Sequence, residues 1–235
     1  MVISFWFVLC ILAAQYLSYK YRYPIVEFGV YPRTFEGLRG IFTSPFVHSG
    51  FYHLLSNAVP LFLLGTTLLY FYRSIAWKAF MLMYLVSGLG TWLIGRPSWH
   101  IGASGIVYGL VAFLFTSGML RKHPGLMAIS LLVVFLYGSL VWGMLPLPLD
   151  MSWEAHLSGA SGGILSAFVF RRMGPQRPVY QWEEEDEEAS GDDNDIEFKQ
   201  PEGPSENMDP DEAKPQQPVI RYIYKPGPKD NEEGA

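Results

Sequence analysis

The chain has 235 residues, of which 50% are hydrophobic and only 17% charged. Residues 1–178 carry 12 Lys and Arg against 4 Asp and Glu, a net charge of +8, whereas residues 179–235 carry 5 against 18, a net charge of −13. A water-soluble body of this size needs many more charged side chains on its surface, which excludes an ordinary soluble domain for the first part.

Six predominantly apolar segments follow one another in residues 1–178. Each is close to the roughly 20 residues that a helix needs to cross the ~30 Å apolar core of a bilayer. The first is predicted to be a retained span, because it has neither the positively charged start nor the small-residue cleavage site of a signal peptide. We therefore expect an all-α membrane protein with six transmembrane helices, at about residues 2–18, 51–72, 75–95, 102–120, 126–146 and 153–171.

The loops predict the orientation. Basic residues gather between the second and third spans, between the fourth and fifth, and after the sixth, at Arg73, Lys78, Arg121, Lys122, Arg171, Arg172 and Arg177. Cytoplasmic loops are enriched in Lys and Arg, so both termini are predicted to be cytoplasmic. The long connection 19–50, rich in aromatic residues and Arg, is expected to lie at the membrane interface.

The C-terminal part has a different composition. Residues 179–235 are strongly acidic and contain recurrent proline, and such a segment cannot bury enough apolar surface to offset its ordering entropy. We expect a transmembrane domain over 1–178 and a disordered acidic tail over 179–235.

Polar side chains inside a membrane are costly and usually mark a functional site. His53 and Asn57 are four residues apart on the second span, Ser104 and Tyr108 have the same spacing on the fourth, and His156 lies near the start of the sixth. These three spans all begin on the side without the basic loops. The polar groups are therefore expected at one depth, near the outer face.

Their chemistry favours acyl transfer. A serine hydroxyl becomes a good nucleophile when a neighbouring histidine accepts its proton, which predicts Ser104 as nucleophile and His156 as general base. The oxyanion that forms needs hydrogen-bond donors, which Asn57, His53 and the backbone N–H of Ser104 can supply. Small residues at Gly105 and Gly109, and at Ala155, Gly159 and Gly163, allow the fourth and sixth helices to approach closely.

Three motifs resemble those of the rhomboid family of intramembrane proteases. They are Gly102-Ala103-Ser104-Gly105, similar to G-x-S-G with Tyr108 one turn on; His48, His53 and Asn57, similar to H-x4-H-x3-N; and Ala155, His156, Gly159 and Gly163, similar to A-H-x-x-G-x-x-x-G. Their order and spacing over about residues 36–171 carry the resemblance. One departure is Leu38-Arg39, where many members have Trp-Arg.

The resemblance implies a six-helix rhomboid-like bundle with a Ser–His dyad and no catalytic acid, cofactor or metal. It also implies a water-accessible cavity, cleavage of transmembrane protein substrates near the outer face, and a bacterial inner-membrane location. We expect supporting roles for His48, Gly102, Gly105, Tyr108, Gly159 and Gly163. Besides substrates and the lipid bilayer, no nucleic-acid partner is expected, and the oligomeric state is left open.

Two alternatives stay open beside the protease. A histidine-ligated metal enzyme is disfavoured because H-E-x-x-H is missing and because His48 and His53, five residues apart, are expected to diverge on a helix. A non-catalytic binder of membrane clients is expected to lack the serine or the histidine. Glu154 is predicted to point away from His156, two residues on, and His100 to lie at the interface.

Overall fold

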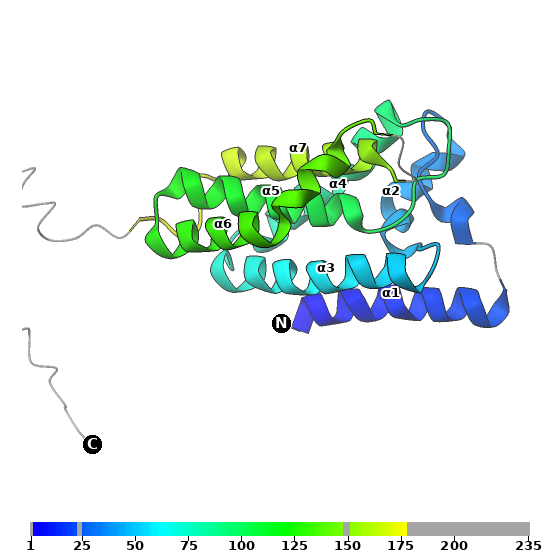
Figure 1. The fold of residues 1–235 in the computed structure, drawn as a ribbon, viewed down its shortest axis with the longest axis horizontal. Helices are drawn as coiled ribbons and strands as arrows, with labels where there is room; N and C mark the ends of the chain where they lie inside the picture. Colours follow the sequence, from blue (N-terminus) through cyan, green and yellow to red (C-terminus); the bar gives the residue numbers. More distant parts are fainter. Residues whose placement is uncertain (1, 23–24, 148–150, 178–235) are drawn as a thin grey trace, which may run out of the picture. The chain divides into compact units, whose positions relative to one another are not determined.

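The computed structural model describes residues 2–22, 25–147 and 151–177, and within these ranges the chain forms helices and no β-strand. Long helices lie alongside one another as a bundle (Figure 1). They are α1 (Val2–Tyr21), α3 (Phe51–Phe71), α4 (Ala76–Ile94), α5 (Ser104–Arg121), α6 (Pro124–Tyr137) and α7 (Trp153–Val169). Their bounds agree with the predicted apolar segments to within a few residues, except that α6 ends at Tyr137 and a 3-10 helix continues toward the predicted end at 146. The all-α fold class is confirmed.

Four helical stretches in the described ranges are long and apolar enough to cross a bilayer. They are α3, α4, α5, and α6 together with the 3-10 helix η4 (Gly138–Met144) that continues it. The chain is therefore a multi-pass membrane protein. Helix α7, with 17 residues, and helix α1 are not among these four, so the count of six spans stays a prediction.

The connection between α1 and α3 folds into short helices at one end of the bundle, on the right in Figure 1. These are η1 (Ile25–Phe28), η2 (Glu36–Arg39), α2 (Gly40–Thr43) and η3 (Ser44–Phe46). Val30 forms an isolated antiparallel bridge with His100, in the loop between α4 and α5. This bridge fixes the connection against the loop that leads into Ser104.

Local sequence explains where helices end and begin at both ends of the bundle. Helix α5 ends at Arg121, and Lys122 adopts a left-handed conformation with φ of 51°. Pro124 then starts α6, where its missing N–H costs nothing. At the other end of the bundle, Ser152 caps α7, its side chain accepting a hydrogen bond from the backbone N–H of Ala155.

Glycines bring α5 and α7 into close contact. A Cβ atom placed on Gly159 would collide with the carbonyl oxygen of Gly105, and one placed on Gly163 would collide with that of Gly109. Backbones that approach this closely leave no room for a side chain. The glycine seam, as we call Gly105, Gly109, Gly159 and Gly163, holds the start of α5 beside the start of α7.

The acidic tail over 179–235 and the predicted boundary at 178/179 lie outside the described residues. For these, the sequence predictions stand untested.

Candidate active site

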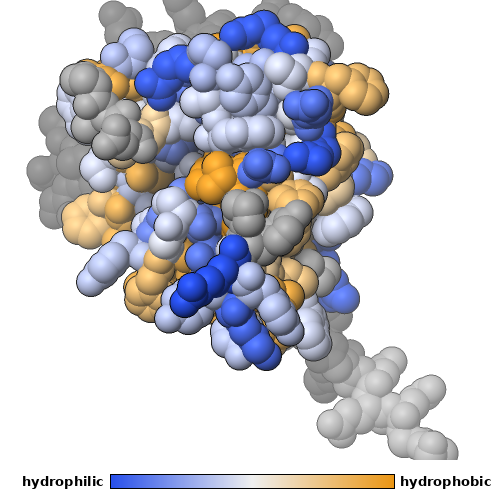
Figure 2. Space-filling model, turned by 90° about the vertical axis from the view of Figure 1, so that its right-hand side faces the viewer, coloured by the Kyte–Doolittle hydropathy of each residue, from blue (hydrophilic) through white to orange (hydrophobic). Residues whose placement is uncertain are grey.

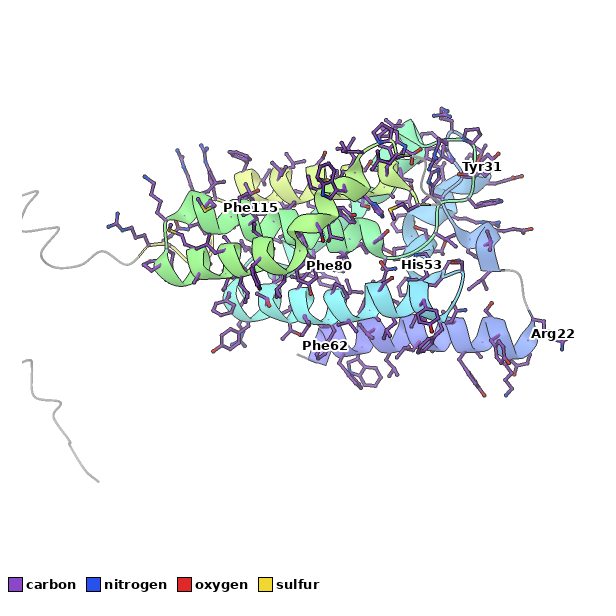
Figure 3. The ribbon with its side chains drawn as sticks, viewed as in Figure 1. Arg22, Tyr31, His53, Phe62, Phe80 and Phe115 are labelled. Atoms are coloured by element: carbon purple, nitrogen blue, oxygen red, sulfur yellow. The ribbon has the colours of Figure 1, made fainter. Side chains whose placement is uncertain are left out.

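A cavity of about 800 Å3 lies among α3, α5, α7, the loop between α4 and α5, and the point where α6 continues into η4. Its lining includes all four residues predicted to take part in the chemistry, His53, Asn57, Ser104 and His156. His53 points from α3 toward the neighbouring helices, near the end of the bundle that also holds Tyr31 (Figure 3). Figure 2 looks onto that end and shows hydrophilic and hydrophobic residues interspersed across it.

Ser104 and His156 form a hydrogen-bonded pair across the glycine seam. The Nε2 atom of His156 lies 2.9 Å from the Oγ atom of Ser104, and its Nδ1 atom lies 2.8 Å from the carbonyl oxygen of Gly143. A carbonyl oxygen only accepts, so Nδ1 carries the proton and, in the neutral ring, Nε2 is the acceptor. The serine hydroxyl therefore donates to an unprotonated nitrogen, which is the arrangement a general base requires.

Tyr108 fixes the plane of this imidazole. Its ring stacks on that of His156 with a centroid distance of 4.1 Å and an interplanar angle of 6°. Gly143 completes the enclosure, because a Cβ atom there would collide with the Tyr108 hydroxyl. The imidazole is thus held by a ring on its face and a carbonyl at its edge, and no carboxylate of the described residues forms a hydrogen bond with it.

His53 and Asn57 lie beside the turn that precedes Ser104. Gly102 has a φ of +103°, and a Cβ atom there would lie 2.7 Å from His53 Nε2 and 3.9 Å from Asn57 Nδ2. The backbone N–H of Ser49 donates to His53 Nδ1 over 3.5 Å, which leaves the proton of the neutral ring on Nε2. Asn57 donates one amide hydrogen to the His53 carbonyl at 2.7 Å and keeps a second.

His48 does not share a helix with His53, so the expectation that the two diverge on one helix is wrong. Helix α3 begins only at Phe51, and the two imidazoles pack edge to face with centroids 5.0 Å apart. His48 is 2% exposed, and neither ring nitrogen has a hydrogen-bond partner among the described residues. Burial, and secondly the nearby His53, lower the pKa of His48 to about 4.

His100 is buried within the protein. Its Nε2 lies 3.0 Å from the carbonyl oxygen of Arg96, and its Nδ1 lies 2.6 Å from Ser152 Oγ. Glu154 points away from His156, as its spacing predicts, but it is fully buried and forms an ion pair with Arg96 at 2.8 Å. Among the described residues, no group of three or more His, Cys, Asp and Glu is placed to hold a metal ion.

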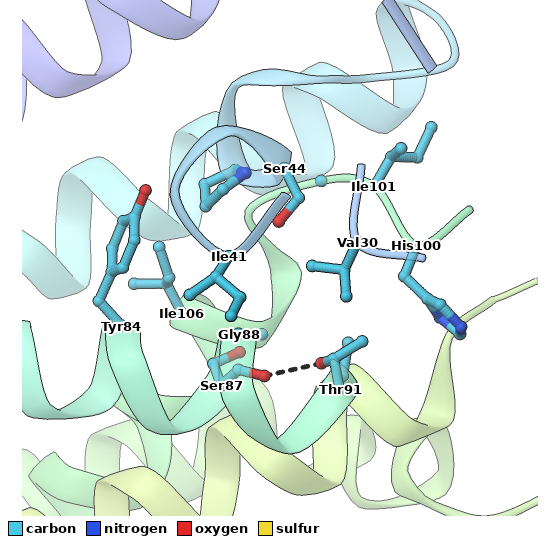
Figure 4. Close-up of a pocket in the computed structure, with 14 residues that line it drawn as sticks. Val30, Ile41, Ser44, Tyr84, Ser87, Gly88, Thr91, His100, Ile101 and Ile106 are labelled. Carbon is cyan, nitrogen blue, oxygen red and sulfur yellow. Dashed lines mark hydrogen bonds between the residues drawn. The ribbon is translucent and has the colours of Figure 1, made fainter. Parts of the chain in front are cut away.

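A second, small cavity lies behind the nucleophile turn (Figure 4). Its volume is about 20 Å3, roughly what one water molecule needs, and its walls come from the first connection, α4 and the start of α5. In Figure 4, Thr91 donates to the Ser87 carbonyl at 2.7 Å and Ser44 lies above them. The Ser44 carbonyl in turn accepts from the Gly102 N–H at 3.0 Å, which supports the turn before Ser104.

Sequence analysis missed Gly143 and the partners of Glu154. Gly143 contributes its backbone carbonyl oxygen, and a search for patterns of side chains does not detect backbone groups. Arg96 and Glu154 carry opposite charges, and both were predicted on the side of the membrane without the basic loops. This was the available indication that the two could pair. Spacing along the chain did not indicate that the two residues, 58 positions apart, meet.

Comparison with known proteins identifies the family. The Rhomboid domain family model matches residues 36–173, more than half of the chain. An uncharacterized protein of Mycobacterium tuberculosis is 35% identical over 150 residues, covering 60% of this chain and 62% of the relative. An uncharacterized protein of Mycobacterium leprae is 34% identical over 142 residues, covering 56% of each chain. RHOMBOID-like protein 1 of Arabidopsis thaliana is 28% identical over 137 residues, covering 55% of this chain and 34% of its own.

The chain spans less than two thirds of the length of these curated relatives. The match nevertheless extends over the described bundle from the first connection to the end of α7, and it contains the motifs quoted above. This protein belongs to the rhomboid family.

Proposed function

We propose that the chain is an intramembrane serine endopeptidase that hydrolyses peptide bonds in or near transmembrane segments of other membrane proteins. The observation that carries the proposal is the 2.9 Å contact between Ser104 Oγ and His156 Nε2, with Nδ1 held by the Gly143 carbonyl. A serine paired with an oriented imidazole in a large cavity that is partly lined by polar side chains is the arrangement that nucleophilic catalysis needs. Family membership supports the same reaction class.

The geometry supports the following steps. Ser104 Oγ attacks the scissile carbonyl carbon while its proton passes to His156 Nε2. The resulting oxyanion accepts hydrogen bonds from His53 Nε2–H, from the free amide hydrogen of Asn57 and from the backbone N–H of Ser104, which opens α5 and has no intrahelical partner. The imidazolium then protonates the leaving amine, and water, activated by the same histidine, hydrolyses the acyl-enzyme.

The distribution of charge supports a location for this chemistry. Exposed basic residues cluster around the short connections at the end of the bundle opposite the dyad, whereas those at the dyad end are mostly spread along the connection between α1 and α3. The clustered ones are Arg73, Lys78, Lys122, Arg171 and Arg172. By the positive-inside rule that end is cytoplasmic, so the dyad lies near the outer leaflet and both termini are cytoplasmic. The mycobacterial relatives favour a bacterial inner membrane. Substrate helices that unwind easily, with a small residue before the cut, are expected, because an intact helix shields its peptide bonds.

The test is cleavage of a model transmembrane substrate in proteoliposomes. Ser104→Ala and His156→Ala are expected to abolish cleavage while the protein still folds. Ser166→Ala, a buried serine elsewhere on α7, and His123→Ala, at the far end of the bundle, serve as controls that keep activity. Full cleavage by either dyad variant would refute the proposed mechanism.

A second measurement separates the protease from a non-catalytic binder of membrane clients. A fluorophosphonate probe is expected to label Ser104 in the wild type and to leave the His156→Ala variant unlabelled. Co-purification of an intact client, without cleavage products or labelling, would instead favour the binder.

A further inference from the structure

Four residues join the loop before α5 to the start of α7, and three of them, Arg96, His100 and Ser152, line the cavity. Arg96 and His100 lie in the loop, and Ser152 and Glu154 lie at the start of α7. We call this group the clasp. Ser104 follows His100 by four residues and His156 follows Glu154 by two, so the clasp joins the two segments that carry the dyad.

The hydrogen bonds of the clasp have defined directions. The Arg96 carbonyl only accepts, so His100 donates to it from Nε2 and accepts at Nδ1 from the Ser152 hydroxyl, 2.6 Å away. Ser152 Oγ in turn accepts from the N–H of Ala155 at 3.2 Å. This chain of bonds runs without a break from the loop to the first turn of α7.

The second half of the clasp is ionic. Glu154 Oε1 accepts from the backbone N–H of Arg96 at 3.1 Å and from its Nε at 2.8 Å, and Arg96 also donates from Nη2 to the Met151 carbonyl at 2.9 Å. The Glu154 side chain is 0% exposed while that of Arg96 is 51% exposed. Burying a carboxylate is expensive, and a well-packed apolar pair often serves stability equally well. A buried carboxylate paired with a half-exposed Arg96 is here better explained by control of the position of α7.

The glycine seam alone does not fix the position of α7 along its axis relative to α5. Glycines set how closely α5 and α7 approach, but their smooth surfaces resist sliding along the helix axes only weakly. One residue of axial rise is 1.5 Å, enough to move the 2.9 Å contact between Ser104 and His156 beyond hydrogen-bond range. A tie between the two helix starts prevents this displacement.

We propose that Arg96 and Glu154 are positioning residues of the dyad, which hold the start of α7 in register with the nucleophile turn. The inference rests on the proposed protease function. It assigns to the ion pair a contribution to turnover that is separate from its contribution to stability.

The experiment measures the rate of fluorophosphonate labelling of Ser104, together with kcat, KM and the thermal unfolding temperature, for full-length protein in proteoliposomes or detergent. Glu154→Ala is expected to lower the labelling rate and kcat by about 100-fold with KM unchanged, since misplacement by about 1 Å has that effect. Glu154→Gln keeps an acceptor oxygen without the charge, so its loss is about 10-fold. Arg96→Lys is expected to retain more activity than Arg96→Ala, and adding Glu154→Gln to Arg96→Ala is expected to recover part of the rate by removing the unpaired charge.

Arg121→Ala is the matched control, because Arg121 also joins α5 to α7, at the far end. Its guanidinium donates to the Phe170 carbonyl at 2.7 Å and to Ser117 Oγ at 2.9 Å. This variant is expected to unfold at a lower temperature and to label at the wild-type rate.

Three outcomes overturn the clasp proposal: labelling at the wild-type rate in the Arg96 and Glu154 variants, a loss no larger than that of a control variant equally destabilised, or a loss confined to KM. Slower labelling beyond that of the control supports it. If Glu154→Ala does not fold, the labelling rates of Glu154→Gln and Arg96→Lys decide between these outcomes. A wild type that is not labelled at all would remove the proposed protease function itself, which distinguishes the two failures.

Discussion

The glycine seam makes a quantitative link between helix packing and catalysis, which Gly159→Ala tests. A Cβ atom on Gly159 would lie 2.7 Å from the Gly105 carbonyl carbon and 3.0 Å from its Cα. Non-bonded carbon atoms settle at about 3.5–4.0 Å, so the helices must separate by about 1 Å. The same displacement lengthens the 2.9 Å contact between Ser104 and His156 to about 3.9 Å, beyond hydrogen-bond range.

The expected cost has two parts. Overpacking is expected to reduce the free energy of unfolding by about 1–3 kcal/mol. Loss of the proton-transfer geometry is expected to lower kcat by about 100-fold. Both are measurable on one preparation, by initial rates of substrate cleavage in proteoliposomes and by thermal unfolding in detergent.

Gly138→Ala is the control for the added methyl group. Its Cβ atom would meet only the Val134 side chain, at an ordinary 3.8 Å, and Gly138 already has the helical φ of −59°. We expect its cleavage rate and stability to match or exceed those of the wild type. Cleavage by Gly159→Ala at the wild-type rate would show that the seam does not hold the dyad together, and the reasoning would be wrong.

Three further predictions concern the surroundings of the dyad. Asn57→Ala is expected to slow cleavage by about 10- to 1000-fold with substrate binding intact, and an unchanged kcat would exclude Asn57 as an oxyanion donor. Tyr108→Phe keeps the stacked ring and is expected to retain activity, whereas Tyr108→Ala frees the His156 imidazole and is expected to lose most of kcat; equal rates for the two would refute the stacking role. The lowered pKa of His48 means that the unfolded chain binds a proton at this histidine more readily than the folded protein does. The free energy of unfolding is therefore unaffected by this group above about pH 6.5 and falls as the pH approaches 4, by about 3 kcal/mol in total. His48→Phe is expected to flatten this dependence in unfolding experiments, and an unchanged slope would contradict it.

The helices were predictable because membrane-spanning segments need long apolar runs. The polar residues within these runs were equally visible, since His53, Asn57 and Ser104 stand out against apolar neighbours. Their convergence followed from the alternating direction of successive helices. The approach of α5 to α7 followed from the spacing of small residues such as Gly105 and Gly159.

Other parts of the site depend on contacts that the spacing of residues along the chain does not predict. The assumption that α3 extends back to His48 failed because the chain turns before Phe51, which brings two imidazoles together that a helix would separate. The ion pair between Arg96 and Glu154 joins the loop before α5 to the start of α7, and their relative position depends on the whole bundle. Predicting it required knowing how far α7 is displaced along its axis relative to α5.

The acceptor that orients the imidazole of His156 belongs to the peptide backbone at Gly143. No codon change removes a main-chain oxygen, so an alanine scan across the cavity does not register it as a hydrogen-bonding partner. Replacing the peptide bond after Gly143 with an ester, which weakens that oxygen as an acceptor, is the substitution that isolates its contribution. A catalytic inventory built from side chains alone is therefore incomplete for this protein.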